Sequence, residues 1–202
     1  MQAAAAGHGQ DDPLALVLAS SSPQRRAILE RLGVPFTARA HATRERKRGE
    51  AGELAIANAL AKARAARVPG AREVVLGCDT LVALGGRIFG KPRDPSAARQ
   101  TLRALSGVTH EVVSGLALVF AGEGTKESER TAIARTAVSF RALDEGLLDW
   151  YLARGEWRGR AGGYAIQGAG AALVRAVQGD YENVVGLPLA TLLDLYPELL
   201  VR

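Results

Sequence analysis

A serine-rich segment followed by arginines, running from residue 20 to residue 26, lies between an apolar run and a helical pattern. Ser22 suits the N-cap of that helix and Pro23 its first position, so backbone N–H groups would face the end of the preceding strand. Such a helix end binds anions, and the hydroxyls of Ser20 and Ser22 with the guanidinium of Arg25 would complete a phosphate cradle. An ordinary strand-to-helix turn with a serine cap has the same pattern.

An acidic residue interrupts an apolar run in the segment Gly77-Cys78-Asp79-Thr80. A carboxylate buried there without a partner is unfavourable by several kcal/mol, so Asp79 needs a cation, a metal ion or a place in a cleft. We therefore expect Asp79 to have a functional role. A nucleophilic role for Cys78 is not expected, because the sequence identifies no basic neighbour that would lower the pKa of its thiol.

The segment from Gly85 to Lys91 resembles a Walker A loop as far as the lysine. A P-loop then requires Ser or Thr to bind Mg²⁺ and a helix that starts there, whereas this chain has Pro92 after a run typical of a β-hairpin. A P-loop ATPase or GTPase is therefore excluded. Lys91 lies on a turn between Gly90 and Pro92, where it is either a phosphate ligand or a solvated lysine.

Two further charged residues have roles that their patterns leave open. Lys62 follows Asn58 by four residues, so the two share a helix face, which is also the usual pattern of a solvated surface. Glu45 is the one acid in the basic run 44–48. It either relieves repulsion among the cations or binds a metal ion whose other ligands are phosphate oxygens.

A glycine-rich segment, residues 162–170, contains Gln167. So many glycines indicate close backbone approach, as in a ligand-binding loop, and Tyr164 and Ile166 argue for packing rather than for a flexible linker. The amide of Gln167 offers an acceptor beside a donor, which matches the N3–H and O4 edge of uracil or thymine.

The elements that must position these residues follow from apolar periodicity and from turn residues. Strands alternate with helices in the first half and pair directly later, so we expect an α/β fold with a mixed sheet. The expected strands are 14–19, 36–40, 73–77 continuing through 81–84, 87–89, 110–120, 131–140 and 171–177, and the expected helices are 23–32, 50–67, 95–105, 144–153 and 187–200.

The composition of the 202 residues, 48% hydrophobic and 23% charged, is that of a soluble globular protein. We expect a disordered tail at 1–12 and one domain at 13–202. The single cysteine excludes a disulfide framework and fits a reducing compartment, and the longest apolar runs, six residues each, are too short to span a membrane. A cytoplasmic location follows as an expectation.

The net charge of +5 favours anionic partners. Nucleic acid is one candidate, but aromatic residues make up only 5% of the chain and form no evident stacking surface. A small phosphorylated ligand fits at least as well.

Taken together, these segments resemble the Maf family of nucleoside triphosphate pyrophosphatases. The likeness extends from Leu16 to Leu195 and rests on several motifs in the family's order: LASSSPQRR, LAKARA, GCDT, GKPRD, LSGVTHEV, AGGYAIQGAGA and GDYENVVGLP. It implies a Maf/ITPase-like fold, an elongated mixed sheet with flanking helices and two lobes around a cleft. It also implies hydrolysis of a nucleoside triphosphate to the monophosphate and pyrophosphate with a divalent cation, Mg²⁺ or Mn²⁺, and allows a homodimer.

The resemblance also implies roles for individual residues. Asp79 would be the catalytic proton acceptor and, with Glu45, would bind the metal ion. The substrate-binding residues would be Ser20, Ser22, Arg25, Lys62 and Lys91.

Three positions bear on base specificity. Thr80 and the loop around Gln167 resemble the dTTP/UTP branch of the family, whereas the branch that acts on 7-methyl-GTP resembles neither. Gln24 departs from the Ser-Pro-Arg-Arg that the dTTP/UTP branch usually has, and this departure concerns base preference rather than the reaction.

The leading hypothesis is therefore a house-cleaning hydrolase of dTTP, UTP and related pyrimidine nucleotides. A pyrophosphatase for 7-methyl-GTP or another modified nucleotide is the first alternative. A nucleotide-binding regulator of septum formation without turnover is the second. A basic nucleic-acid-binding module is the third, and it lacks the expected aromatic surface.

Overall fold

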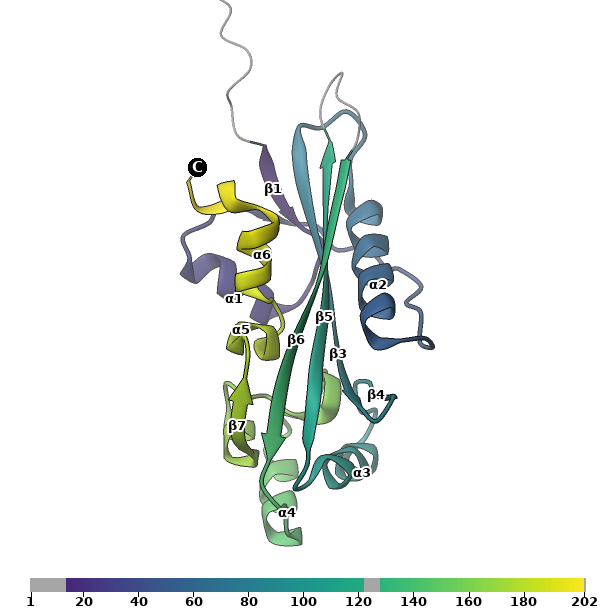
Figure 1. The fold of residues 1–202 in the computed structure, drawn as a ribbon, viewed down its shortest axis with the longest axis vertical. Helices are drawn as coiled ribbons and strands as arrows, with labels where there is room; N and C mark the ends of the chain where they lie inside the picture. Colours follow the sequence, from purple (N-terminus) through teal and green to yellow (C-terminus); the bar gives the residue numbers. More distant parts are fainter. Residues whose placement is uncertain (1–13, 122–127, 202) are drawn as a thin grey trace, which may run out of the picture.

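One seven-stranded mixed sheet runs the length of the elongated molecule (Figure 1). The computed structural model describes residues 14–121 and 128–201, so the tail expected at 1–12 lies outside the described residues. The strands are β1 (Ala15–Leu18), β2 (Thr37–Ala38), β3 (Glu73–Leu84), β4 (Arg87–Phe89), β5 (Thr109–Ala121), β6 (Ser128–Phe140) and β7 (Val174–Gln178). The helices are α1 (Pro23–Arg31), α2 (Ala51–Ala66), α3 (Pro95–Leu105), α4 (Glu145–Ala153), α5 (Tyr181–Val185) and α6 (Leu189–Leu195), with short 3₁₀ turns η1 (Ala161–Gly163), η2 (Ala169–Leu173) and η3 (Pro197–Leu200).

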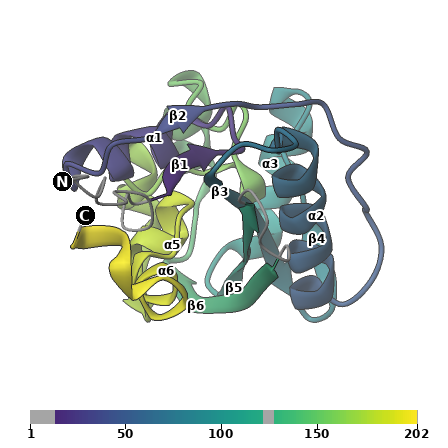
Figure 2. The ribbon, with the colours of Figure 1, turned by 90° about the horizontal axis from the view of Figure 1, so that it is seen from above.

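Three long antiparallel strands, β3, β5 and β6, form the centre of the sheet, and β1 and β2 run parallel at one end of it. Helix α2 covers one side of that end, while α1, α5 and α6 cover the other side (Figure 2). Helices α3 and α4 lie at the opposite end (Figure 1). The expected mixed sheet with flanking helices is confirmed. None of the described helices is long and apolar enough to cross a lipid bilayer.

Strand β3 has different neighbours along one of its edges. Strand β1 pairs with residues 73–76 of β3, and β4 pairs with residues 82–84. None of the described strands therefore pairs with residues 77–81 on this edge, although β5 pairs with them on the other. The segment Gly77 to Thr80, which contains Asp79, lies in this gap between the two ends of the sheet. The turn at Gly85 and Gly86 joins β3 to β4, as the hairpin pattern predicts.

The hydrophobic core has parts on both sides of the gap. At one end Ile28 of α1 and Leu192 of α6 pack on the face of β3 that carries Leu76. On the opposite face of the same strands, the alanines of α2 pack against Val75. At the other end Tyr151 of α4 and residues of α3, β5 and β6 form a separate cluster. The clusters at the two ends give the molecule its two lobes.

Helix α2 lies unusually close to the sheet because the strands below it carry glycine. A Cβ atom on Gly77 would lie 2.1 Å from the carbonyl oxygen of Ala59, and one on Gly115 would lie 2.3 Å from the carbonyl carbon of Ala55. Real side chains do not approach backbone atoms so closely, so only glycine allows this contact. The register pairs Gly115 with Asp79, which puts the close contact beside the acidic residue.

The C-terminal segment differs from the sequence expectation. The strand expected at 171–177 begins only at residue 174, because the residues before it form the 3₁₀ turn η2. The helix expected at 187–200 is divided into α6 and η3 at Pro197, which cannot continue the preceding helix. Helix α5 was not expected. Its first turn is capped by Asp180, whose carboxylate accepts hydrogen bonds from the N–H groups of Glu182 and Asn183.

We predict that Gly77→Ala lowers the free energy of unfolding by about 2 to 3 kcal/mol, because the new methyl group forces α2 away from the sheet. Urea denaturation followed by circular dichroism measures the change. Gly146→Ala in α4 is the matched control, since its Cβ would lie 3.5 Å from a carboxylate oxygen of Asp144, an ordinary van der Waals contact, and we expect a change within about 0.5 kcal/mol. Equal effects of the two substitutions on the free energy of unfolding would contradict the close packing of α2 against β3.

A buried histidine lies in the cluster at the α4 end. His110 is 1% exposed, and its Nε2 atom is 3.0 Å from the hydroxyl oxygen of Tyr164. The imidazole also contacts the ring of Phe140 edge to face, with centroids 4.8 Å apart. Its Nδ1 atom has no hydrogen-bond partner among the described residues. Burial lowers the pKa of His110 from its usual value of 6.5 to about 4, because the charged imidazolium is poorly solvated there.

This pKa predicts a loss of stability in mild acid. Below pH 6.5 His110 becomes protonated in the unfolded chain, whereas in the folded chain it stays neutral until about pH 4. The free energy of unfolding therefore falls as the pH falls through that range. The loss reaches about 3 kcal/mol at the lower end and is absent above pH 7. His110→Gln should show a flatter profile in urea titrations between pH 7 and pH 4. Parallel profiles for the two proteins would rule this explanation out.

Candidate functional site

A cleft of about 1040 Å³ opens at the gap in β3, between the two lobes. Its walls come from α1, α2, the segment before α2, β3, the β4–α3 connection, the glycine-rich segment 162–170 and the end of α5. The cleft thus collects residues from distant parts of the sequence. The sequence-predicted site residues that line it are Ser22, Gln24, Arg25, Glu45, Lys62, Asp79, Thr80, Lys91 and Gln167.

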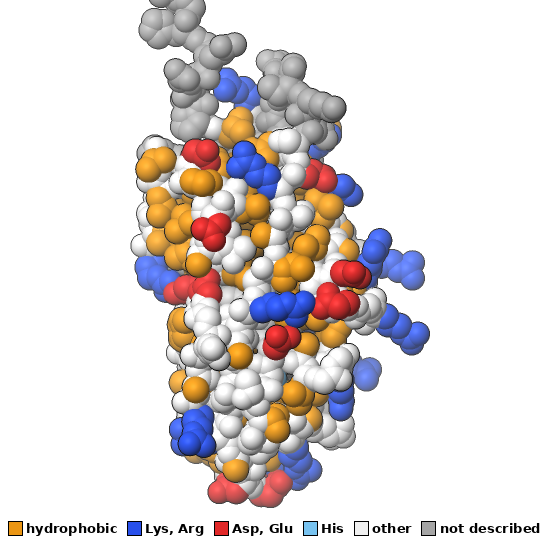
Figure 3. Space-filling model, in the orientation of Figure 1, with side chains coloured by type: hydrophobic (Ala, Val, Ile, Leu, Met, Phe, Trp, Pro, Cys, Tyr) orange, Lys and Arg blue, Asp and Glu red, His pale blue; other side chains and the backbone are white. Residues whose placement is uncertain are grey.

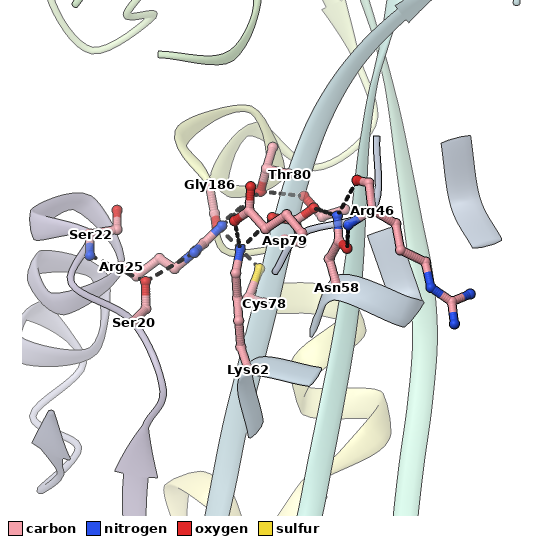
Figure 4. A network of polar contacts seen from close by, with 12 residues as sticks. Ser20, Ser22, Arg25, Arg46, Asn58, Lys62, Cys78, Asp79, Thr80 and Gly186 are labelled. Atoms are coloured by element: carbon pink, nitrogen blue, oxygen red, sulfur yellow. Dashed lines mark hydrogen bonds and ion pairs between the residues drawn. The ribbon is translucent and has the colours of Figure 1, made fainter. Parts of the chain in front are cut away.

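Asp79 is the centre of a hydrogen-bond network in this cleft (Figure 4). The residue is 7% exposed; Oδ1 accepts from Nζ of Lys62 at 2.5 Å, and Oδ2 accepts from Nδ2 of Asn58 at 2.9 Å. Both donors belong to α2 and stand one helical turn apart, on the face that the glycine contact brings against β3. Lys62 is therefore the cation that the buried Asp79 required.

Glu45 joins the network through the same lysine. Its Oε1 atom lies 2.7 Å from Nζ of Lys62, and its side chain is about half exposed. The hydrogen bond from Lys62 lowers the pKa of Glu45 against the opposing effect of partial burial, and the charges of Lys91 and Arg25 contribute in the same direction. One ammonium group thus bridges two carboxylates from different segments.

Arg25 is buried and held from three directions. Its Nε donates to the carbonyl oxygen of Gly186 at 2.8 Å, Nη1 donates to Oγ of Ser20 at 3.0 Å, and Nη2 donates to Oγ1 of Thr80 at 3.2 Å. A guanidinium has five N–H groups, so two remain for a ligand in the cleft. Ser20 itself does not line the cleft. The structure places it behind Arg25, where it orients the guanidinium.

Ser22 and Gln24 contact each other at the N-terminus of α1. The Ser22 hydroxyl donates to Oε1 of Gln24 at 3.2 Å and makes no side-chain cap on α1, contrary to the expectation from its N-cap position. In the observed conformation the hydroxyl lies against the amide oxygen of Gln24, where its own oxygen accepts no hydrogen bond from the N–H groups of the first turn. Both side chains still reach the cleft.

Thr80 and Cys78 face the α1 side of β3, opposite to Asp79. The Thr80 hydroxyl shares a hydrogen bond of 2.9 Å with Ser114 and receives one from Arg25, so in this structure it supports the arginine. Cys78 is fully buried, and its thiol lies 3.4 Å from the Gly186 carbonyl. Burial raises the pKa of Cys78, which agrees with the expectation that it is not a nucleophile.

The remaining predicted residues lie across the cleft. Lys91 and Gln167 are both exposed, on two connections that are joined by a hydrogen bond from the N–H of Gly162 to the carbonyl of Gly90, at 3.2 Å. The Gln167 segment is also held by Tyr151, whose hydroxyl accepts from the N–H of Ala165 at 3.1 Å. This anchoring makes the segment a fixed wall rather than a flexible linker.

The cleft is strongly basic. Figure 3 shows Lys and Arg side chains that project from the side of the molecule where α2 lies. Such an excess of positive charge attracts polyanions and speeds their encounter with the protein. The charged residues that line the cleft are the cations Arg25, Arg46, Lys47, Lys62, Lys91, Arg93, Arg158 and Arg160 and the acids Glu45, Asp79 and Glu156.

Two residues of the network were not among the site residues predicted from the sequence. Asn58 contacts Asp79 directly, and the carbonyl of Gly186 holds Arg25. The spacing of Asn58 from Lys62 was a usable signal, because it placed the amide on the lysine's helix face. Gly186 acts through its backbone at the end of α5, where its φ of 132° favours glycine, and no side-chain pattern reveals such a contact.

The donor atoms fit a divalent cation of the Mg²⁺ type. Glu45 and Asp79 both reach Nζ of Lys62, so oxygens of the two carboxylates already surround one positive charge. Mg²⁺ is usually held by one or two carboxylates together with substrate phosphates and water. No group of three or more His, Cys, Asp or Glu residues suited to a metal ion occurs within 14–121 and 128–201.

Known proteins similar to this chain are named for nucleotide chemistry. A dTTP/UTP pyrophosphatase from Moorella thermoacetica is 48% identical over 183 residues, which cover 89% of this chain and 92% of the relative. The dTTP/UTP pyrophosphatases from Myxococcus xanthus and Pyrococcus furiosus are 47% and 43% identical, over 88% and 89% of this chain and 89% and 93% of their own lengths. A solved structure of a nucleoside-triphosphatase, a dITP/XTP pyrophosphatase from Mycobacterium abscessus, aligns with 64% of this chain and 76% of its own chain at 20% identity and a TM-score of 0.40.

The motifs that resemble Maf proteins therefore belong to a likeness that covers most of the chain. The sequence profile described as Maf-like protein matches residues 15–199, which include every cleft residue described above. The relatives named above are more than 40% identical to this chain along nearly their whole lengths. The chain therefore belongs to the Maf family.

Proposed function

We propose that this protein hydrolyses nucleoside triphosphates, dTTP and UTP above all, to the nucleoside monophosphate and pyrophosphate in a house-cleaning role. The observation that carries the proposal is the meeting of Asp79, Glu45 and Lys62 in a basic cleft that Arg25 and Lys91 also line. The names of the similar proteins support the same reaction and the same pair of substrates.

The basic residues would bind the triphosphate. Arg25 offers two N–H groups on a rigid, buried fork, which is the geometry that grips two phosphate oxygens. Lys91 adds a mobile point charge from the opposite wall. When phosphate oxygens enter, the ammonium of Lys62 gains a new anionic partner beside the two carboxylates with which it is already paired.

Glu45 and Asp79 would hold the divalent cation, Mg²⁺ or Mn²⁺. When bound, such an ion neutralises phosphate oxygens and makes the phosphorus atom easier to attack. Without a cation, the carboxylates and the triphosphate repel each other. A divalent cation bound by both would offset this repulsion.

Asp79 would accept the proton of the attacking water. As the water oxygen bonds to the α-phosphorus, its proton moves to the carboxylate, and the bond from the α-phosphorus to the bridging oxygen breaks. Pyrophosphate leaves with that electron pair. The hydrogen bonds from Asn58 and Lys62 keep the Asp79 carboxylate in one orientation, so its free lone pairs point into the cleft.

Gln167 would recognise the pyrimidine through the paired donor and acceptor of its amide. Gln24 lies on the opposite wall and contacts Ser22, so its effect on base preference would be exerted from the α1 side. Thr80 would act on the substrate through Arg25, with which it shares a hydrogen bond. A cytoplasmic location and a homodimer stay predictions from the sequence.

A nucleotide screen with purified protein and Mg²⁺ or Mn²⁺ tests the reaction. We predict release of pyrophosphate from dTTP and UTP, and a fall in kcat of at least about 100-fold in Asp79→Asn, because the amide cannot take the proton. The monophosphate product and pyrophosphate are both measured. No turnover of any canonical or modified triphosphate would end the proposal.

Other outcomes of the same screen identify the alternatives. Preference for 7-methyl-GTP would overturn the pyrimidine assignment while keeping the reaction. Tight binding of triphosphates without turnover would favour a regulator, and salt-sensitive binding of oligonucleotides alone would favour a nucleic-acid-binding module.

A second prediction concerns the guanidinium fork. Arg25→Lys keeps the charge but loses the planar arrangement that Gly186, Ser20 and Thr80 hold in place, so we expect KM for dTTP to rise about 10-fold or more. Arg31→Lys, at the other end of α1, is the matched control. Arg31 pairs with Glu182 and does not line the cleft, so its KM should stay within about twofold of the original value. Equal KM values for the two variants would show that the fork does not bind substrate.

A further inference from the structure

The side chain of Asn58 connects two parts of the cleft that no strand or helix joins. Its Oδ1 accepts a hydrogen bond from the N–H of Arg46 at 2.8 Å. Its Nδ2 donates to the carbonyl of Arg46 at 3.2 Å and to Oδ2 of Asp79 at 2.9 Å. Both N–H groups of the amide and its oxygen are therefore used (Figure 4). The side chain is buried, with 3% of the residue exposed.

The paired contact with Arg46 resembles one step of a β-ladder. An amide that accepts from the N–H and donates to the C=O of one residue fixes both peptide planes around it. The first of these planes includes the carbonyl of Glu45, the residue whose carboxylate reaches Lys62 at 2.7 Å. Asn58 thus determines where the Glu45 backbone lies relative to Asp79.

The segment that contains Glu45 has little else to hold its backbone. Residues 40–48 form no helix or strand, and Arg44 to Arg48 are all exposed. In residues 40–48, all of which the structure describes, the backbone forms only two hydrogen bonds, and both are with the side chain of Asn58. The repulsion among the neighbouring cations of residues 44–48 works against a fixed conformation.

We propose that Asn58 is a positioning residue: it anchors the backbone of residues 45–46 to α2 and orients the Asp79 carboxylate with the same amide, so that the two acids of the site face one cation. The kinetic part of this inference rests on the proposed hydrolase, whereas the anchoring part does not. The contrast is Asn183, a fully buried asparagine outside the cleft lining that donates to the Val112 carbonyl and to Thr136 inside the sheet.

Limited proteolysis tests the anchor without any substrate. Trypsin cleaves after Arg44, Arg46, Lys47 and Arg48, but only when this segment leaves its bound conformation. We expect Asn58→Ala to increase the rate of cleavage within 44–48 by about 10-fold or more, measured by mass spectrometry of the first fragments. Asn183→Ala is the matched control and should not produce early cleavage at these four positions. An unchanged rate in Asn58→Ala, or the same early fragments from both variants, would overturn the anchor.

Asn58→Ser is a second variant that keeps a small polar side chain at this point and adds no charge beside Asp79. Its hydroxyl is too short to contact both Arg46 and Asp79, so its cleavage rate within 44–48 should also rise above that of the unsubstituted protein. The thermal midpoint of each variant shows whether it is folded. If Asn58→Ala does not fold, the comparison of Asn58→Ser with the unsubstituted protein decides the question by the same fragments, and an unchanged rate overturns the anchor.

Steady-state kinetics test the orientation of Asp79. In Asn58→Ala we expect kcat for dTTP to fall about 10- to 100-fold while KM changes less than about threefold, because Arg25 and Lys91 remain to bind the phosphates. Partial unfolding also lowers the apparent kcat at unchanged KM, so kcat is measured well below the thermal midpoint of each variant and divided by the folded fraction, and the 10- to 100-fold fall must persist after that correction. Unchanged kcat with faster proteolysis would refute the catalytic half of the inference, and an inactive parent protein would refute the proposed function while the proteolysis still decides the anchor.

Discussion

The close contact between α2 and the sheet is the constraint on which the site depends. Gly77 and Gly115 lack the Cβ atoms that would hold the helix away, so the backbone of α2 lies directly on β3 and β5. The side chain of Asn58 is short, and it reaches Asp79 only because the helix is so near. A larger residue at either glycine would separate the amide and the ammonium of Lys62 from the acid that they hold.

Charge balance then explains why the cleft is arranged around one lysine. Asp79 is almost fully buried, and an unpaired carboxylate there would destabilise the fold by several kcal/mol. Lys62 neutralises it and also binds the more exposed Glu45. The local charge near Lys62 is thus negative, while the surrounding walls are positive. A polyanion is attracted to the walls, and a divalent cation is attracted to the acid pair, which is the combination that a metal-bound triphosphate supplies.

Much of this arrangement was predictable from local sequence patterns, and the rest was not, for a physical reason. The periodicity of apolar residues located β3, α2 and α3 closely, and the isolated acid in an apolar strand already required a cation nearby. The bonds from Arg25 to Gly186 and from Asn58 to Arg46 join residues that are 161 and 12 positions apart, and one partner in each is a backbone group. Such contacts leave no local pattern. The contact between Ser20 and Arg25 is different, because it joins two side chains only five positions apart, and the sequence placed both beside the same helix N-terminus.

The gap in β3 allows a single strand to supply both sides of the site. Consecutive residues of a strand point to opposite faces, so Asp79 faces α2 while Thr80 faces α1 and its arginine. In the middle of a continuous sheet, two such residues could not meet one ligand, because a neighbouring strand would separate them. Strands β1 and β4 stop short of each other beside residues 77–81, so neither of them separates the two faces of β3 at this edge. The interruption of the sheet therefore brings the acid and the basic fork to the same cleft.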